Sequence, residues 1–322
     1  MEKIQLPEVN AVKVIIKDFD IKQTLECGQV FRFKKINDNN YIVYSGDKMV
    51  EVLQEKLTSH NINTALNLTN MSIRDLESMT DNSLDIKNIV LVNFYCNNDE
   101  FENYWKKYFD LETDYSKIKS RLKQHGNALS KAMEYGSGIR ILRQEKFETI
   151  ISFIVSANNN ISRIQKIMFS ICEKYGQKMC SKTGMHYYSF PTPKDLASAL
   201  PEKMRAECNV GYRDKYIVQT AKLIHNKQID IENMASLDTD ELVKELQKLS
   251  GIGQKVADCI ALFAYGRGEV YPVDVWSKRV FEKLYVGHEL PKKQVHKRVH
   301  KVFGKYAGYA QQYLFYYGRE NF

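Results

Sequence analysis

The sequence predicts an α+β protein in which an N-terminal antiparallel-sheet domain precedes a larger all-helical domain. Roughly the first hundred residues alternate apolar with polar side chains and are rich in Val, Ile, Tyr and Phe, as half-buried strands are. From about Asp114 onward, apolar residues recur at helical spacing, and Gly and Pro fall mostly at the joints. We therefore expect two domains, residues 1–114 and 115–322.

The expected elements follow from these two periodicities. Strands are predicted within 11–20, 29–38 and 40–56, where the turn-like segments N-D-N-N and S-G-D-K separate them. Helices are predicted over 115–135, 145–175, 213–227, 239–250, 254–265, 275–285 and 291–303. The basic stretch 292–305 has an apolar stripe, so we interpret it as an ordinary amphipathic helix, with contact to a DNA backbone as the lesser alternative.

Composition excludes several classes of protein. Hydrophobic residues make up 43% and charged residues 27% of the 322 residues, as in ordinary globular proteins. No apolar run approaches the ~18 residues of a membrane span, and the N-terminus does not resemble a signal peptide. The formal net charge of +8 is compatible with a polyanionic partner. We expect a soluble, intracellular, monomeric protein.

The cysteines give no sign of a metal site. The six cysteines are irregularly spaced, form no C-x-x-C pair, and make no zinc-like cluster with histidine. Reduced thiols are the natural interpretation. We therefore expect neither a metal nor an organic cofactor.

The stretch L-S-G-I-G-Q-K-V-A-D-C-I, residues 249–260, predicts two helices joined by a tight turn. Gly251 and Gly253 flank Ile252, and we expect this turn to need unusual backbone angles. The N–H groups at the start of the second helix could bind phosphate oxygens without reading sequence. The alternative is an ordinary helical hairpin.

Two residues after this turn are candidates for chemistry. Lys255 lies in the first turn of the second helix, where the helix dipole disfavours a cation by ~0.3–1 kcal/mol and burial would lower the amine's pKa further. Such a lysine can form a Schiff base; the alternative is a surface lysine. Asp274, in Y-P-V-D-V-W, is a predicted helix N-cap that could also face a substrate.

At this point the sequence resembles the helix-hairpin-helix-GPD superfamily of DNA glycosylases, and within it the 8-oxoguanine DNA glycosylases. The resemblance rests first on two segments: the hairpin that contains the lysine, and V-Y-P-V-D-V. Further segments resemble family elements in matching order: L-E-C-G-Q-V-F-R-F at 25–33, G-I-R-I-L-R-Q-E at 138–145, F-I-V-S-A-N-N-N-I-S-R-I at 153–164, G-Y-R at 211–213 and Y-A-G-Y-A-Q through Phe315 at 306–315. The resemblance covers most of the chain.

The resemblance implies base-excision repair by a bifunctional glycosylase and lyase acting on double-stranded DNA that contains 8-oxoguanine, with a TBP-like N-terminal sheet. Lys255 falls on the Schiff-base nucleophile and Asp274 on the catalytic carboxylate. Gly28 matches the residue whose carbonyl accepts N7–H of the oxidised base, a hydrogen that guanine lacks. The remaining base contacts fall on Gln311, at the Watson–Crick edge, and on Phe315 and Cys259, on the two faces of the ring.

The resemblance also implies a group that fills the gap left by the flipped base and holds the orphaned cytosine: Asn158, Arg163, Tyr212 and Arg213. Each matched residue has a plainer alternative. Phe315 and Cys259 could be core residues, Gln311 a solvated helix position, and the two arginines phosphate contacts or surface ion pairs.

Two positions depart from the family pattern. Trp276 stands where many relatives carry His, which puts the phosphate contacts near Asp274 in doubt, and Cys27 stands where Ser is usual. The last residues contain no cysteine, so the iron–sulfur loop of some superfamily members is not expected.

Two alternatives stay open. One is a glycosylase of the same superfamily for another damaged base, against which Lys255 and the segment around Gly28 argue. The other is a non-catalytic DNA-binding module built on the same hairpin, which has no need of Lys255 and Asp274 together.

Overall fold

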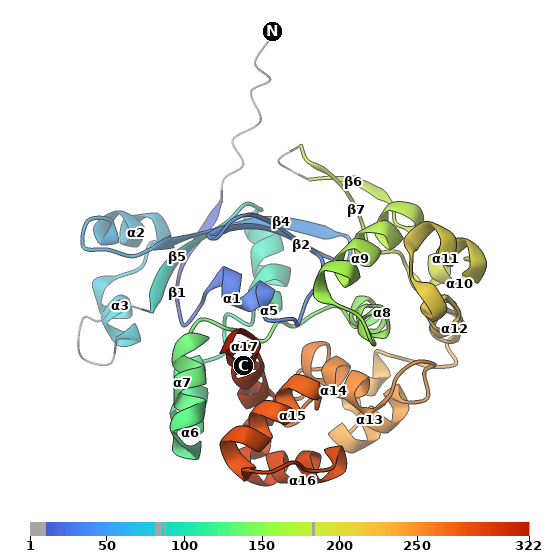
Figure 1. Ribbon diagram of the computed structural model, residues 1–322. Coiled ribbons are helices and arrows are strands. Elements are labelled where there is room, and N and C mark those ends of the chain that lie inside the picture. Colours follow the sequence, from blue (N-terminus) through green and yellow to red (C-terminus); the bar gives the residue numbers. More distant parts are fainter. Residues whose placement is uncertain (1–10, 81–85, 87, 182–183, 322) are drawn as a thin grey trace.

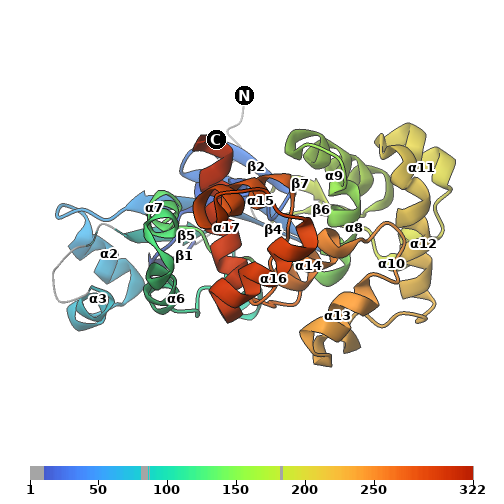
Figure 2. The ribbon, with the colours of Figure 1, turned by 60° about the horizontal axis from the view of Figure 1, so that its bottom comes forward.

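The computed structural model describes residues 11–80, 86, 88–181 and 184–321. Figure 1 shows an N-terminal sheet with its helices beside a larger helical part, and Figure 2 shows the same arrangement turned so that the helices come forward. The predicted order, sheet first and helices after it, is confirmed. None of the helices among the described residues is long and apolar enough to cross a membrane.

The N-terminal sheet has five antiparallel strands in the order β1-β5-β4-β3-β2. The three stretches predicted to be extended contain the first four of them. The strands are β1 (Val12–Lys17), β2 (Phe33–Asn37), β3 (Asn40–Ser45), β4 (Lys48–Lys56) and β5 (Ile89–Phe94). The sequence did not predict β5, because all six of its residues are buried and it therefore shows no alternation.

Helices cover both faces of this sheet. Ile15, Ile89 and Leu91 pack on one face against α2 and α3, whereas Ile16, Val90 and Val92 pack on the other face in a core with Trp105 and Phe109. The N-terminal helices are α1 (Ile21–Glu26), α2 (Ile62–Thr69), α3 (Ile73–Met79), α4 (Asn98–Glu100) and α5 (Lys106–Tyr108), with a π-helical turn at Phe101–Trp105.

The helical part begins at α6 and ends at α17. Its helices are α6 (Tyr115–Leu122), α7 (Asn127–Tyr135), α8 (Lys146–Ser156), α9 (Ile161–Tyr175), α10 (Pro193–Ala197), α11 (Pro201–Cys208), α12 (Asp214–His225), α13 (Thr239–Leu246), α14 (Gln254–Phe263), α15 (Val275–Phe281), α16 (Lys292–Phe303) and α17 (Ala307–Asn321). One detail of the all-helical expectation is wrong, because a short hairpin, β6 (Lys178–Cys180) with β7 (His186–Tyr188), follows α9. Strands of three residues are too short for a recognisable alternation.

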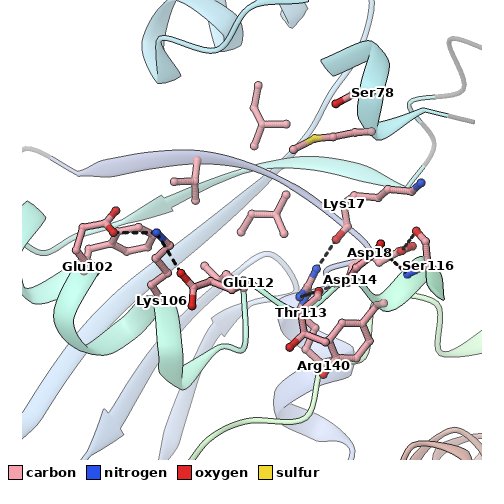
Figure 3. Close-up of a pocket in the computed structure, with 17 residues that line it drawn as sticks. Lys17, Asp18, Ser78, Glu102, Lys106, Glu112, Thr113, Asp114, Ser116 and Arg140 are labelled. Carbon is pink, nitrogen blue, oxygen red and sulfur yellow. Dashed lines mark hydrogen bonds and ion pairs between the residues drawn. The ribbon is translucent and has the colours of Figure 1, made fainter. Parts of the chain in front are cut away.

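Arg140 joins the two parts at their boundary. Its buried guanidinium donates to the carbonyl oxygens of Lys17 at 2.7 Å, Asp18 at 3.1 Å and Asp110 at 2.6 Å, and Figure 3 shows this side chain beside β1. The Asp18 carboxylate in turn accepts a hydrogen bond from Lys119 at 2.8 Å. Charge-assisted bonds to backbone carbonyls hold the sheet against the start of the helical part.

Candidate active site

The helical hairpin between α13 and α14 depends on one glycine conformation. Gly251 has φ +83°, and a Cβ there would lie 2.7 Å from Cδ2 of Tyr216. The expectation of unusual angles is wrong for Gly253, whose φ of −90° and ψ of 178° are extended backbone. Gly253 is instead the N-cap of α14, and a Cβ there would meet nothing within 4 Å. A side chain at Gly253 would therefore project into open space beside the first turn of α14.

Lys255 is half-buried in the first turn of α14, with its Nζ 5.7 Å from the centroid of the Phe153 ring. Its pKa lies above the ordinary value, because the Cys259 sulfur, and after it Asp274 and Asp258, favour the ammonium against the opposing effect of burial. The expectation of a lowered pKa is therefore wrong for this structure. The Cys259 sulfur and the two carboxylates outweigh desolvation.

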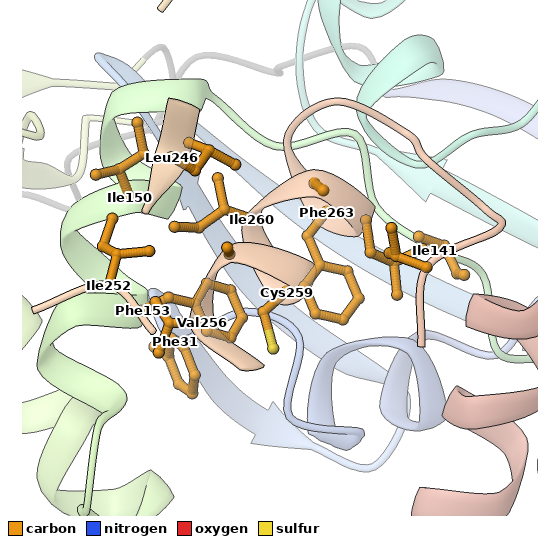
Figure 4. Packing of buried hydrophobic residues seen from close by; sticks show 14 of the residues in the cluster. Phe31, Ile141, Ile150, Phe153, Leu246, Ile252, Val256, Cys259, Ile260 and Phe263 are labelled. Atoms are coloured by element: carbon orange, nitrogen blue, oxygen red, sulfur yellow. The ribbon is translucent and has the colours of Figure 1, made fainter. Parts of the chain in front are cut away.

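Cys259 lies one turn after Lys255 on the buried side of α14. Burial raises the pKa of its thiol to about 11, against the opposing effect of the nearby Lys255 charge. Figure 4 shows Cys259 among the buried side chains of α8 and α14, near Phe153 and Val256. The position can therefore offer a polarisable sulfur surface beside the lysine.

Asp274 caps α15, as predicted. Its side chain accepts from the backbone N–H of Ser277 at 2.6 Å, and the Ser277 hydroxyl accepts from the backbone N–H of Asp274 at 3.0 Å. This capping box fixes the carboxylate in one rotamer. Because Asp274 also helps to raise the pKa of Lys255, the cap and the electrostatic partner of the lysine are the same group.

The segment around Gly28 meets the last helix. Gly28 has φ +83°, and a Cβ there would lie 3.2 Å from Cε1 of Phe315 and 3.8 Å from Cδ1 of Ile161. Phe315 follows the buried Gln311 by one turn of α17, so both side chains share a helix face. Three segments thus meet in one continuous surface, called the wall below: the loop at Gly28, the start of α9 and the last helix. Sequence reasoning missed Ile161, whose β-branched side chain looks like any other helix start.

Gln29 anchors this loop, a role that sequence reasoning also missed. Its buried amide donates to the carbonyls of Thr24 at 2.8 Å and Arg140 at 2.7 Å, and its Oε1 accepts from the N–H of Leu142 at 2.9 Å. These bonds tie the loop to the chain just before α8. A glutamine within an apolar segment was the available signal, because buried amides must find partners.

Three of the residues matched to the opposite-base group lie near the turn between α8 and α9. Asn158 is exposed with φ +50°, and Arg163 is exposed on the first turn of α9. The resemblance places Arg213 in the group that holds the orphaned cytosine, but its side chain is only 4% exposed. Its guanidinium donates to the carbonyls of Ala157 and Asn158, the latter at 3.2 Å. In this structure Arg213 holds the turn that presents Asn158.

Tyr212 completes this group and joins it to the hairpin. The side chain is 54% exposed, and the Arg213 guanidinium lies 4.5 Å from the centroid of its ring. The ring also meets Tyr216 edge-on at 6.2 Å, and Tyr216 is the residue that packs against Gly251. Tyr216 therefore couples the hairpin to the group around Asn158, and its place in α12 gave no hint of this role.

Known proteins share these features. The family model described as HhH-GPD superfamily base excision DNA repair protein matches residues 151–305, which contain the hairpin, the lysine and the capping aspartate. The fold and the site thus define a base-excision DNA repair protein of that superfamily. The model described as 8-oxoguanine DNA glycosylase, N-terminal domain, matches residues 11–150. The chain belongs to the 8-oxoguanine DNA glycosylase family.

Individual relatives agree with this assignment. The N-glycosylase/DNA lyase of Saccharomyces cerevisiae is 33% identical over 261 residues, 76% of this chain and 67% of the relative. The probable N-glycosylase/DNA lyase of Methanothermobacter thermautotrophicus is 30% identical over 232 residues, 66% of this chain and 72% of the relative. The Clostridium acetobutylicum 8-oxoguanine glycosylase/lyase, solved with double-stranded DNA containing cytosine opposite 8-oxoG, is 37% identical with a TM-score of 0.81, and the match covers 96% of each chain.

Proposed function

We propose that this chain is a bifunctional DNA glycosylase and lyase that excises 8-oxoguanine from double-stranded DNA, with cytosine preferred opposite the lesion. The observation that carries the proposal is the half-buried Lys255 on the hairpin helix, in electrostatic contact with the capping carboxylate of Asp274. A non-catalytic hairpin module gains nothing from burying a lysine against a fixed carboxylate. The enzyme acts as a monomer.

The damaged base must leave the duplex before a side chain can reach its sugar, at a cost of a few kcal/mol. The wall made by Gly28, Gln311 and Phe315 receives it. The Gly28 carbonyl accepts N7–H of 8-oxoguanine, and guanine has no hydrogen there. A site that hydrogen-bonds a substrate N–H rejects the analogue lacking it, because the polar group is then left without a partner. Gln311 pairs with the Watson–Crick edge, and Phe315 and Cys259 hold the two faces of the ring.

Excision and strand scission use the lysine. Its amine attacks C1′, the bond from C1′ to the base breaks, and the base leaves with the electron pair and gains a proton while the lysine loses one. The sugar ring then opens as the C1′–O4′ bond breaks and O4′ takes up a proton, which gives the Schiff base at C1′. Loss of a proton from C2′ expels the 3′ phosphate by β-elimination. Asp274 stabilises the positive charge that develops on the sugar and keeps the lysine in position. Because the pKa of Lys255 is raised in the free protein, the rate of attack should increase with pH through the neutral range.

Borohydride trapping tests this proposal. Wild-type protein incubated with a duplex containing 8-oxoguanine opposite cytosine should form a covalent adduct on reduction, and Lys255→Gln should not. Lys248→Gln is the matched control, since Lys248 lies on the same hairpin but is 61% exposed and paired with Glu245. It should trap like wild type. An adduct at the wild-type level in Lys255→Gln would remove the lysine from the mechanism.

A further inference from the structure

A groove of about 690 Å³ separates the start of α14 from α16. Val256 and Val273 lie on its floor, and Lys255 lines it as well. Figure 2 shows α14 and α16 at the front of the molecule. The groove thus begins at the candidate nucleophile and continues away from it along α16.

The α16 side of the groove carries positive charge. Lys292, Lys293, His296 and Lys297 line it, at positions that share one face of the helix. The three lysines are exposed, and none has an ion pair within the part of the chain that the structure describes. The adjoining face of α16 is buried in the core through Val295 and Val299, and it fixes how the helix is turned. The packing of α16 therefore directs these cations into the groove.

The one carboxylate that lines the groove does not cancel this charge at the rim. Asp258 is only 1% exposed and accepts from the Gln254 amide at 2.9 Å. Its second oxygen lies 3.5 Å from Nε2 of His296, so the imidazole screens the carboxylate from the groove. What a ligand meets is an apolar floor bordered by lysines.

We propose that this groove binds the sugar–phosphate backbone of the damaged DNA strand next to the lesion, with deoxyribose on Val256 and Val273 and phosphates on Lys293 and Lys297. This inference rests on the proposed function, because Lys255 can reach C1′ only if that strand passes the start of α14. The backbone alternates apolar sugars with anionic phosphates, which matches an apolar floor and a basic rim. The contacts are independent of base sequence.

The test is the salt dependence of DNA binding. Lys293→Gln/Lys297→Gln is compared with Arg298→Gln/Lys301→Gln, an equal charge change at exposed positions of α16 outside the groove. The probe is a duplex carrying a tetrahydrofuran abasic analogue opposite cytosine, titrated at several salt concentrations. The slope of log K against log salt is negative, and each lost phosphate contact reduces its magnitude by about 0.9. Replacing the two groove lysines should therefore reduce the magnitude by about 1.8. The control pair should bind with the wild-type slope.

A second measurement places the contact. A neutral methylphosphonate replaces one phosphate at a time along the damaged strand. At one position it should weaken DNA binding by wild type and by the control pair but not by the groove pair. Equal slopes for the two pairs, or no position with this selectivity, would overturn the proposal. Retained DNA binding with lost affinity for an acidic amphipathic peptide in the groove pair would assign the groove to a protein partner instead. Excision of 8-oxoguanine by wild type is measured separately, so failure of the proposed function is distinguished from failure of the groove.

Discussion

Replacing Gly251 and Gly253 in turn by alanine separates the two roles of the hairpin. At Gly251, alanine must adopt φ +83° and place its Cβ 2.7 Å from Tyr216. The left-handed conformation costs about 1–2 kcal/mol and the overpacking about 1–3 kcal/mol. The reduced entropy of the unfolded chain returns about 0.4–1 kcal/mol, so Gly251→Ala should lower the free energy of unfolding by about 1–4.6 kcal/mol.

Gly253→Ala should behave in the opposite way. Its backbone is extended and a Cβ meets no atom within 4 Å, so the loss of a favourable N-cap, about 0.5–1 kcal/mol, roughly cancels against the entropic gain. The added methyl group nevertheless projects into the space before the α14 N–H groups. We therefore expect near wild-type stability with weakened binding to duplex DNA.

Urea unfolding and DNA titration at one fixed salt concentration measure the two effects. The signature is a large loss of stability in Gly251→Ala and a selective loss of DNA affinity in Gly253→Ala. If both variants unfold at the same urea concentration, the backbone argument for Gly251 is wrong. If Gly253→Ala binds DNA like wild type, no phosphate approaches the start of α14.

Three further predictions concern residues around the site. Arg163→Ala should reduce the preference for cytosine opposite the lesion by about 1–3 kcal/mol, measured as excision from duplexes with C, A, G or T; equal losses at all four would assign Arg163 to the backbone. Arg213→Ala should lose about 2–4 kcal/mol of stability in urea because its carbonyl partners lose their donors, whereas Arg163→Ala should unfold like wild type. The Asp258 carboxylate, 3.5 Å from Nε2 of His296, raises the pKa of His296 above 6.5, so the stability that this ion pair adds is full below pH 6.5 and is lost as pH rises through the raised pKa. The stability difference between wild type and His296→Gln should shrink over the same range, and a growing difference would contradict the pairing.

The sequence predicted the elements whose pattern is visible along the chain. The alternating strands β2 to β4, the cap at Asp274 and the apolar stripe of α16 each follow from side-chain order alone. Strand β5 was not predicted because burial on both faces removes the alternation. The helical hairpin was placed correctly, but the difference between Gly251 and Gly253 depends on Tyr216, which lies in another helix.

The site shows the same limit. Family motifs located Lys255 and Cys259, but the direction of the pKa shift of the lysine depends on which acidic groups the fold places around it. The resemblance assigned Arg213 to the orphaned cytosine, and only the three-dimensional structure reveals that it also donates to the carbonyls of the α8–α9 turn. Gln29 lies within the matched segment 25–33, but the resemblance assigned it no role. Its hydrogen-bond partners are backbone groups that tertiary packing brings close, so they cannot be found from the sequence.

The contact between Gly28 and Phe315 has a consequence for biosynthesis. One side of the wall emerges early from the ribosome, and the other side belongs to α17, which is made after every other described helix. The hairpin with Lys255 is synthesised before α17, so under the proposed function a nascent chain carries its nucleophile before it carries the surface of α17 that contacts the base. The selectivity that we propose for this contact would therefore be acquired last, when α17 docks against the loop at Gly28.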